Sequence, residues 1–117
     1  MYVDGFVLVV PTKNLPAYRK MAKLGGKVWR EHGALEYREC VGDHLDIEGM
    51  AHSFPALCKL KPGESVVFAW ITYKSRAHRD RVNAKVMKDP RLHMPPDGMP
   101  FDFKRMVYGG FKVLVDA

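Results

Sequence analysis

The sequence predicts an α+β fold in which four strands and two helices follow one another in the order β-α-β-β-α-β. Two observations lead to this order. Two segments, residues 6–10 and 66–71, are apolar without interruption, and a basic segment with helical spacing follows each of them. A continuous apolar run indicates a strand that is covered on both faces. The 117 residues suit a single domain, residues 1–117, with one core.

The first strand covers about residues 3–10, and the helix that follows has Asn14 as a suitable N-cap. Gly33 is placed to end this helix in a left-handed conformation. The pair Gly25-Gly26 costs about 1 kcal/mol of helix stability per residue, and we expect it to allow a close approach between helix and sheet. The apolar face of the helix consists of Tyr18, Met21, Ala22, Gly25, Val28, Trp29 and His32.

The second strand, residues 35–41, alternates apolar and polar side chains and is therefore expected at an edge of the sheet. Residues 42–63 are irregular, with a short helical turn at residues 54–58. The third strand, residues 65–73, is the most apolar segment of the chain. Its composition predicts a place at the centre of the sheet.

Ser75 is a suitable cap for the second helix, and Asp89-Pro90 is expected to stop it. A loop rich in Pro and Met, residues 91–102, leads to the last strand, residues 105–115. The pair Gly109-Gly110 within that strand predicts a bulge or kink.

This order of elements is the split βαβ, or ferredoxin-like, arrangement, in which the first and third strands are central. The helices can cover only one face of such a sheet. Leaving about eight apolar side chains wet on the other face would forgo about 16 kcal/mol of burial, whereas a whole domain is stable by about 5–15 kcal/mol. We therefore expect a homodimer in which the two sheets cover each other and form a dimeric α/β barrel.

The chain carries a formal net charge of +6, and its basic residues are concentrated in the two helical segments. We expect a positively charged helical layer, which either keeps the protein soluble or attracts polyanions. No segment is long and apolar enough to span a bilayer, and the first residues lack the features of a secretion signal. We expect a cytoplasmic protein without membrane contact, in which Cys40 and Cys58 are reduced.

Four segments carry a resemblance to a known family: HGALEY at residues 32–37, VVFAWI at 66–71, RDRVNAKVM at 79–87 and FDFKRMVYGGF at 101–111. Over nearly its whole length the chain resembles the YbaA-like family of bacterial proteins of unknown function. The resemblance implies a ferredoxin-like subunit and a dimer built sheet to sheet, and it implies no established activity. The wider superfamily of dimeric α/β barrels includes cofactor-independent monooxygenases, haem-degrading enzymes and small-ligand binders.

We expect a small-molecule site in the cleft between the helices and their own sheet, with no cofactor. His32 beside aromatic rings would suit proton transfer near neutral pH, but its place at a helix C-terminus equally suits a capping role. Arg105 would suit a carboxylate, which an arginine can bind through two hydrogen bonds. The residues predicted to line this site are Trp29, His32, Tyr37, Trp70, Asn83, Arg105 and Tyr108, with Tyr18 and Met87 near them.

Two further clusters of polar residues stand out. Arg79-Asp80 and Asn83 predict either an ion-pair network or an anchor for the final loop through Asp102 or Arg105. Residues in the loop after the second strand offer five potential metal ligands, but their spacing matches no zinc or calcium template, so no metal is predicted. These five residues are Asp43, His44, Asp46, Glu48 and His52.

RNA-recognition modules share this strand order and stack bases on aromatic side chains, a role open to Phe6, Phe68 and Trp70. The signature that starts the third strand of those modules is absent, and the positive charge lies on the helices. Nucleic acid is therefore the less favoured partner. The sequence predicts a homodimer that binds a small molecule. RNA binding through the basic helical layer and a monooxygenase-like activity are the alternatives, and the question of enzymatic activity stays open.

Overall fold

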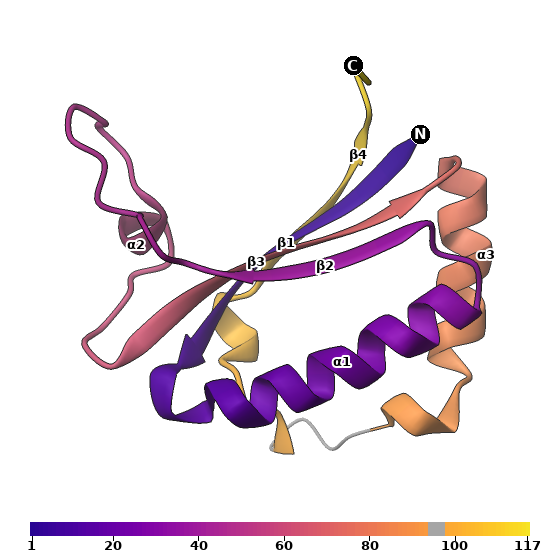
Figure 1. Ribbon diagram of the computed structural model, residues 1–117, viewed down its shortest axis with the longest axis horizontal. Helices are drawn as coiled ribbons and strands as arrows, with labels where there is room; N and C mark the ends of the chain where they lie inside the picture. The colour runs from indigo at the N-terminus through magenta and orange to yellow at the C-terminus, as the bar shows by residue number, and fades with distance from the viewer. Residues whose placement is uncertain (94–97) are drawn as a thin grey trace.

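The computed structural model describes residues 1–93 and 98–117, and its elements follow the predicted order (Figure 1). The middle of the predicted loop at residues 91–102 lies outside the described residues. The short helical turn predicted after the second strand is confirmed as a helix of its own. The elements are β1 (Tyr2–Pro11), α1 (Leu15–Glu31), β2 (Glu36–Val41), α2 (Phe54–Leu57), β3 (Glu64–Tyr73), α3 (Arg76–Met87) and β4 (Val107–Lys112), with 3₁₀ turns at Thr12–Asn14, Pro90–Leu92 and Phe103–Arg105.

The four strands form one antiparallel sheet in the order β2-β3-β1-β4. The central positions predicted for the first and third strands and the edge position predicted for the second are confirmed. Directly paired residues share a face, and Val7 pairs with both Phe68 and Val107. This register assigns every strand residue either to the sheet face that α1 covers, which we call the helix face, or to the opposite face.

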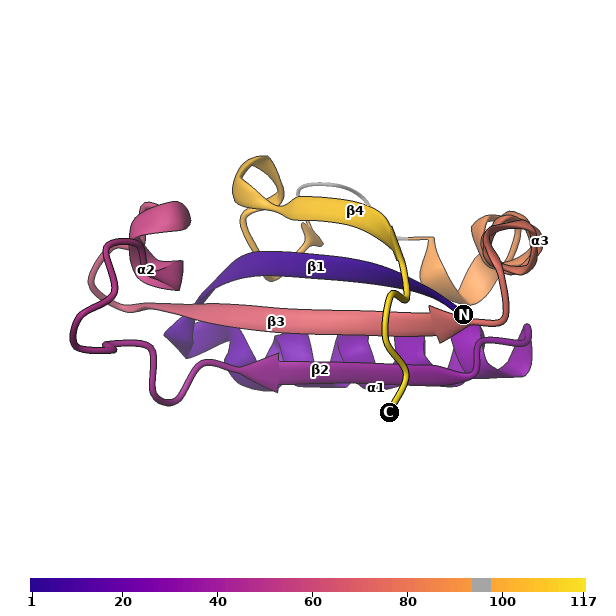
Figure 2. The same cartoon turned by 90° about the horizontal axis from the view of Figure 1, so that it is seen from above.

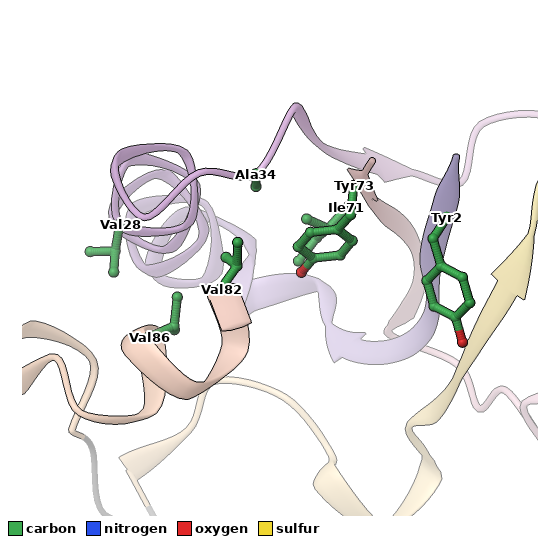
Figure 3. Close-up of a cluster of buried hydrophobic side chains, with 7 residues drawn as sticks. All are labelled: Tyr2, Val28, Ala34, Ile71, Tyr73, Val82 and Val86. Atoms are coloured by element: carbon green, nitrogen blue, oxygen red, sulfur yellow. The ribbon is translucent and has the colours of Figure 1, made fainter. Parts of the chain in front are cut away.

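Helix α1 covers one face of the sheet, whereas α2 and α3 lie at opposite ends of it (Figure 2). Helix α3 packs against α1 rather than lying flat on the strands. Val82 and Val86 of α3 are buried between the two helices, together with Val28 of α1 (Figure 3). Ile71 and Tyr73 of β3 complete this cluster from the sheet. Because α3 packs beside α1 and not over the strands, part of the sheet face that α1 covers has no helix over it.

The face opposite α1 is apolar and largely uncovered. Its end near α2 is closed, where Val9 and Val66 pack on the buried Cys58, and Thr72 is buried at the other end of β3. Across the remainder, Phe68 is 43% exposed and Phe111 is 62% exposed. We call this surface the open face, which consists of Val7, Phe68, Trp70, Val107 and Phe111.

The glycine pair of the first helix has the predicted effect. A methyl group at Gly25 would lie 3.1 Å from the Tyr37 hydroxyl oxygen, and one at Gly26 would lie 2.9 Å from the ring carbon Cδ1 of Tyr37. The helix therefore approaches β2 closely through these two residues. Gly33 has a φ of 116° and ends α1 as predicted.

One local prediction holds in part and another is wrong. Asn14 occupies the N-cap position of α1 as predicted, but its side chain makes no capping hydrogen bond, and its amide donates instead to the Pro100 carbonyl oxygen at 3.4 Å. The predicted bulge at Gly109-Gly110 is absent from the described strand, because both residues pair with β1 in an unbroken register. A methyl group at Gly110 would lie 2.2 Å from the hydroxyl oxygen of Tyr2, so this glycine makes room for a tyrosine side chain.

Both cysteines carry free thiols, and the Ser75 side chain caps α3 by accepting a hydrogen bond from the His78 backbone amide. Among the helices of the described chain, none has the length and apolar character needed to cross a bilayer.

Candidate functional site

The helix face of the sheet contains a cleft of about 260 Å³. It lies between α1, the central strands and the segment that precedes β4. Most of its lining is aliphatic, aromatic or methionine, and its polar groups are few. The side chains that line it include Phe6 and Leu8 of β1, Met21 and Trp29 of α1, Ala69 and Ile71 of β3, and Met99, Phe101 and Met106 of the final segment.

Regular spacing in the sequence brings these side chains together. Residues at intervals of three and four along α1 share one helix face, which places Tyr18, Ala22 and Trp29 toward the sheet. Alternate residues of a strand share one sheet face, which places Ala69 and Ile71 toward the helix. The cleft is thus a gap in a two-layer core, where α3 does not cover the strands.

One wall of the cleft is a hydrogen-bonded group of two tyrosines and a carboxylate. The Tyr18 hydroxyl donates to one oxygen of Glu39, and the Tyr37 hydroxyl donates to the other at 2.5 Å. Burial, reinforced by the neighbouring Glu39, raises the pKa of both tyrosines far above the usual value of 10. Both hydroxyls therefore stay protonated, and both carboxylate oxygens have donors.

Outside this wall lies a second hollow of about 850 Å³, between α1 and β2, which we call the groove. Helix α1 runs alongside β2 at this place (Figure 1). The groove and the cleft share Tyr18, Ala22, Tyr37 and Glu39 as lining residues, so the two spaces adjoin. Basic residues of α1 line the groove, namely Arg19, Lys23, Lys27 and Arg30.

A second polar network lies at the α3 end of the sheet. The Asn83 side-chain oxygen accepts hydrogen bonds from the indole nitrogen of Trp29 and from the Tyr73 hydroxyl, both at 3.2 Å. These bonds satisfy two buried donors with one acceptor. They also fix the orientation of the Trp29 ring, which lines the cleft.

The same network contains a buried ion pair. Asp4 is 1% exposed, and its Oδ1 lies 3.4 Å from Nη1 of Arg79. Burial raises the pKa of Asp4, and the charge of Arg79 opposes that rise. Arg79 also donates to the Tyr108 hydroxyl at 2.9 Å and to the Tyr2 hydroxyl at 3.3 Å.

Four of the seven residues predicted for the site lie in or beside the cleft. Trp29 and Tyr37 line it, and Asn83 holds the Trp29 ring. Tyr108 stacks on Phe6, a lining residue, with ring centroids 4.8 Å apart. Met87 and Tyr18, which were placed near the site, also line the cleft.

The other three residues lie elsewhere. His32 binds Asp89 at 2.9 Å, beyond the C-terminus of α1. Arg105 pairs with Glu64 and with Asp102. His32 is 57 residues from Asp89, and Arg105 is 41 residues from Glu64, so both partners are distant in sequence.

Trp70 lies on the opposite side of the sheet. Its neighbours Ala69 and Ile71 face α1, so its own side chain belongs to the open face. There its ring lies 5.8 Å from that of Phe68.

The predicted ion-pair network of α3 is present, since Arg79 bridges Asp4 and Asp80. The alternative, an anchor through Asp102 or Arg105, is wrong because those two residues pair with each other. The link from α3 to the last strand is Tyr108 instead. The five potential metal ligands between Asp43 and His52 are all exposed.

Sequence reasoning missed Glu39, which lines the cleft, and Asp4, which belongs to the neighbouring polar network. A signal for both was available. Glu39 is two residues from Tyr37, and Asp4 is two residues from Tyr2 and from Phe6, so each shares a strand face with core residues.

Residues 1–103 match the family described as "Protein of unknown function (DUF1428)". The chain belongs to this family. Among relatives of the DUF1428 chain, the uncharacterized protein YbaA of Escherichia coli K12 is 44% identical over 115 residues, covering 98% of this chain and 97% of YbaA. YbaA of Shigella flexneri matches to the same extent. The expected membership of a YbaA-like family of unknown function is confirmed.

Solved structures resemble the DUF1428 chain in fold. An uncharacterized NIPSNAP domain protein from Burkholderia xenovorans superposes with a TM-score of 0.58 and 16% identity, covering 100% of this chain and 95% of that protein. Protein Atu4242 from Agrobacterium tumefaciens superposes with a TM-score of 0.57 and 17% identity, covering 96% and 92%. At these identities the likeness shows the shared α+β fold.

Proposed function

We propose that the protein binds a small, mainly apolar molecule in the cleft. The observation that carries this proposal is the cleft itself, an apolar hollow of about 260 Å³ with a few placed polar groups. Ligand sites commonly have this composition and volumes of about 300–1,000 Å³, so the cleft suits a small ligand. The hydrogen bonds that hold Tyr37 and Trp29 keep the lining preorganised.

The test uses the two tryptophans of the chain, which lie on opposite faces of the sheet. In a Trp70→Phe variant, the fluorescence reports on Trp29 alone. We expect a saturable emission shift on titration with eight-carbon probes, namely n-octanol, octanoate and octylamine. The matched Trp29→Phe variant, which reports from the open face, should show no such shift. If none of the three probes shifts Trp29, binding in the cleft is refuted.

We also propose that two copies pair through the open face. The protein exposes 8280 Å², whereas a compact monomer of 13.3 kDa would expose about 6,450 Å². The excess of about 1,800 Å² is larger than the about 800 Å² per partner that a standard interface buries, and the exposed side chains of the open face contribute to it. The radius of gyration, 15.0 Å against about 13.4 Å expected, agrees with a flat subunit.

Analytical ultracentrifugation tests the pairing. We expect a dimer at micromolar concentration for the wild type and a monomer for Phe68→Glu, because a charge would be buried at the interface. Leu24→Glu is the matched control, since Leu24 is similarly exposed, at 39%, but lies on α1. A wild type that sediments as a monomer contradicts the pairing.

RNA binding through the basic layer of α1 is the second candidate, and the basic residues along the groove favour it. The aromatic residues do not form one stacking surface, since Phe6 lies on the helix face and Phe68 on the open face. RNA held by α1 would bind with an affinity that falls steeply with salt. Fluorescence polarisation with single-stranded RNA at low and high salt separates this candidate from cleft binding.

A further inference from the structure

We propose that the cleft ligand is an amphipathic anion, whose apolar body lies in the cleft and whose carboxylate lies in the groove. This inference rests on the proposed function and adds the chemical class of the ligand. The occupant we commit to is a free acyl-chain carboxylate. Three features of the site support it: the adjoining of cleft and groove, the sign of the groove's charge, and the pairing of its carboxylates.

The first feature is continuity. The cleft and the groove meet at the wall formed by Tyr18, Tyr37 and Glu39. In the proposed complex, the body of the ligand lies against this wall on the cleft side and its head group extends past the wall into the groove. The body would replace water on an apolar lining, and the head would stay hydrated between α1 and β2.

The second feature is charge. Arg19, Lys23 and Lys27 follow one another at intervals of four along α1, which aligns them in one stripe at the groove. None of the salt bridges formed among residues 1–93 and 98–117 involves these three side chains. Like charges at this spacing repel one another, and a bound anion would relieve that repulsion.

The third feature is that the acidic residues of the groove already have partners. Both oxygens of Glu39 accept hydrogen bonds from tyrosines, and Glu36 lies 3.8 Å from Arg38. Neutral tyrosine donors leave the charge of Glu39 in place, but the groove lining has five basic side chains against two acidic ones, so a cationic head group would meet a net positive field. The site thus distinguishes an anion from a neutral or cationic analogue of the same chain length.

The experiment compares three probes that share one chain and differ in the head group. Octanoate, n-octanol and octylamine are titrated into the Trp70→Phe protein below their aggregation concentrations, and binding is followed by Trp29 fluorescence and by calorimetry. We expect octanoate to bind about tenfold more tightly than octanol, the gain from about two exposed ion pairs, and octylamine to bind most weakly. The preference should shrink as salt is raised.

Charge-reversal variants locate the head group. In a Lys23→Glu/Lys27→Glu variant, we expect octanoate affinity to fall to that of octanol while octanol affinity is unchanged. The matched control is Lys13→Glu/Lys20→Glu, which changes the net charge equally but alters exposed residues that do not line the groove. This control should keep the preference for octanoate.

The outcomes separate the two proposals. If octanol and octanoate bind equally, the anionic head group is refuted and cleft binding stands. If both double variants lose octanoate binding equally, the general field of the protein is responsible and the placement at the groove is refuted. If none of the probes binds, the proposed function itself fails.

Discussion

Breaking the ion pair between Asp4 and Arg79 by removing the arginine is expected to destabilise the α3 end of the sheet. Asp4 is 1% exposed, and the Arg79 side chain is 15% exposed. The Asp4 Oδ1 atom makes no hydrogen bond to the described residues, so the charge of Arg79 is its principal compensation. Without Arg79, the Asp4 carboxylate would keep its neutral polar neighbours Asn83 and Tyr108 but would lose the opposite charge that compensates its burial.

The magnitude follows from this geometry. Two unit charges 3.4 Å apart attract each other by about 5 kcal/mol at an effective dielectric constant of about 20. Breaking a buried pair by removing one partner typically costs about 3–5 kcal/mol. Because Arg79 is partly exposed, we expect Arg79→Met to lower the free energy of unfolding at pH 7 by about 3 kcal/mol. That is a large share of the about 5–15 kcal/mol typical of a domain.

Urea denaturation followed by circular dichroism measures this change. Arg81→Met, an exposed residue of the same helix, is the matched control and should cost less than about 0.5 kcal/mol. An Asp4→Asn/Arg79→Met double variant should recover much of the loss, because the unpaired charge is gone. If Arg79→Met costs no more than Arg81→Met, or if the double variant recovers nothing, the reasoning is refuted.

The same variant should respond to pH. Burial raises the folded-state pKa of Asp4 above its unfolded value of 3.8, so the folded protein binds this proton more readily than the unfolded chain. The free-energy cost of burying ionised Asp4 is therefore fully present above the folded-state pKa of this carboxyl, and the cost decreases as the pH falls through that pKa. Without Arg79 the pKa of Asp4 rises further. We therefore expect the free energy of unfolding of Arg79→Met to differ less from that of the wild type at pH 5 than at pH 7.

Three further predictions follow from other contacts. Gly25→Ala should raise the free energy of unfolding by up to about 1 kcal/mol only in a Tyr37→Phe background, as measured by urea denaturation. In the wild-type background, the Tyr37 hydroxyl lies too close to the added methyl group and cancels the gain. The hydrogen bonds from Arg105 lower the pKa of Glu64 from 4.5 to about 2, so stability should fall as the pH drops from 4.5 to 2, and Glu64→Gln should flatten this dependence in acid denaturation. Cys40 lies beside Phe68 on the open face, so its labelling by a thiol reagent should slow as protein concentration rises, while the buried second thiol stays unreactive until unfolding. A rate independent of concentration would contradict pairing there.

The sequence predicted the order of elements well because the strongest signals were unambiguous. The continuous apolar runs are short and rich in Val, which favours central strands. Ser75 and Gly33 mark helix ends through local chemistry that does not depend on the remainder of the fold. The glycines of the last strand were different. Gly110 is required by the Tyr2 side chain of a neighbouring strand, and this long-range contact is not visible in a local pattern.

The candidate site was harder to predict for a related reason. A strand that is apolar on both faces has no alternation to show which face a residue occupies, so Trp70 could not be separated from the cleft until the register was known. His32 and Arg105 each have polar partners far away in sequence, which removed them from the site. Trp29 and Tyr37 were predictable because helical spacing and strand alternation assign them to one face.

The two proposed surfaces lie on opposite faces of one sheet, and this has a consequence for how they can be coupled. The cleft lies on the side of the sheet that α1 covers, whereas the open face is on the opposite side. Figure 2 shows α1 on one side of the sheet only. A partner copy on the open face would leave the cleft and the groove accessible. Communication between them would have to pass through the strands, where Ala69 lines the cleft and its neighbours Phe68 and Trp70 lie on the open face.

A close-packed sheet transmits little change unless it has two distinct arrangements, so we expect the two events to be independent. The Phe68→Glu variant should therefore bind octanoate within about twofold of the wild type even as a monomer. Calorimetry on the Phe68→Glu variant measures this affinity. A large loss of binding in the folded monomer would mean that the cleft takes its shape from the dimer, because independence allows no such change.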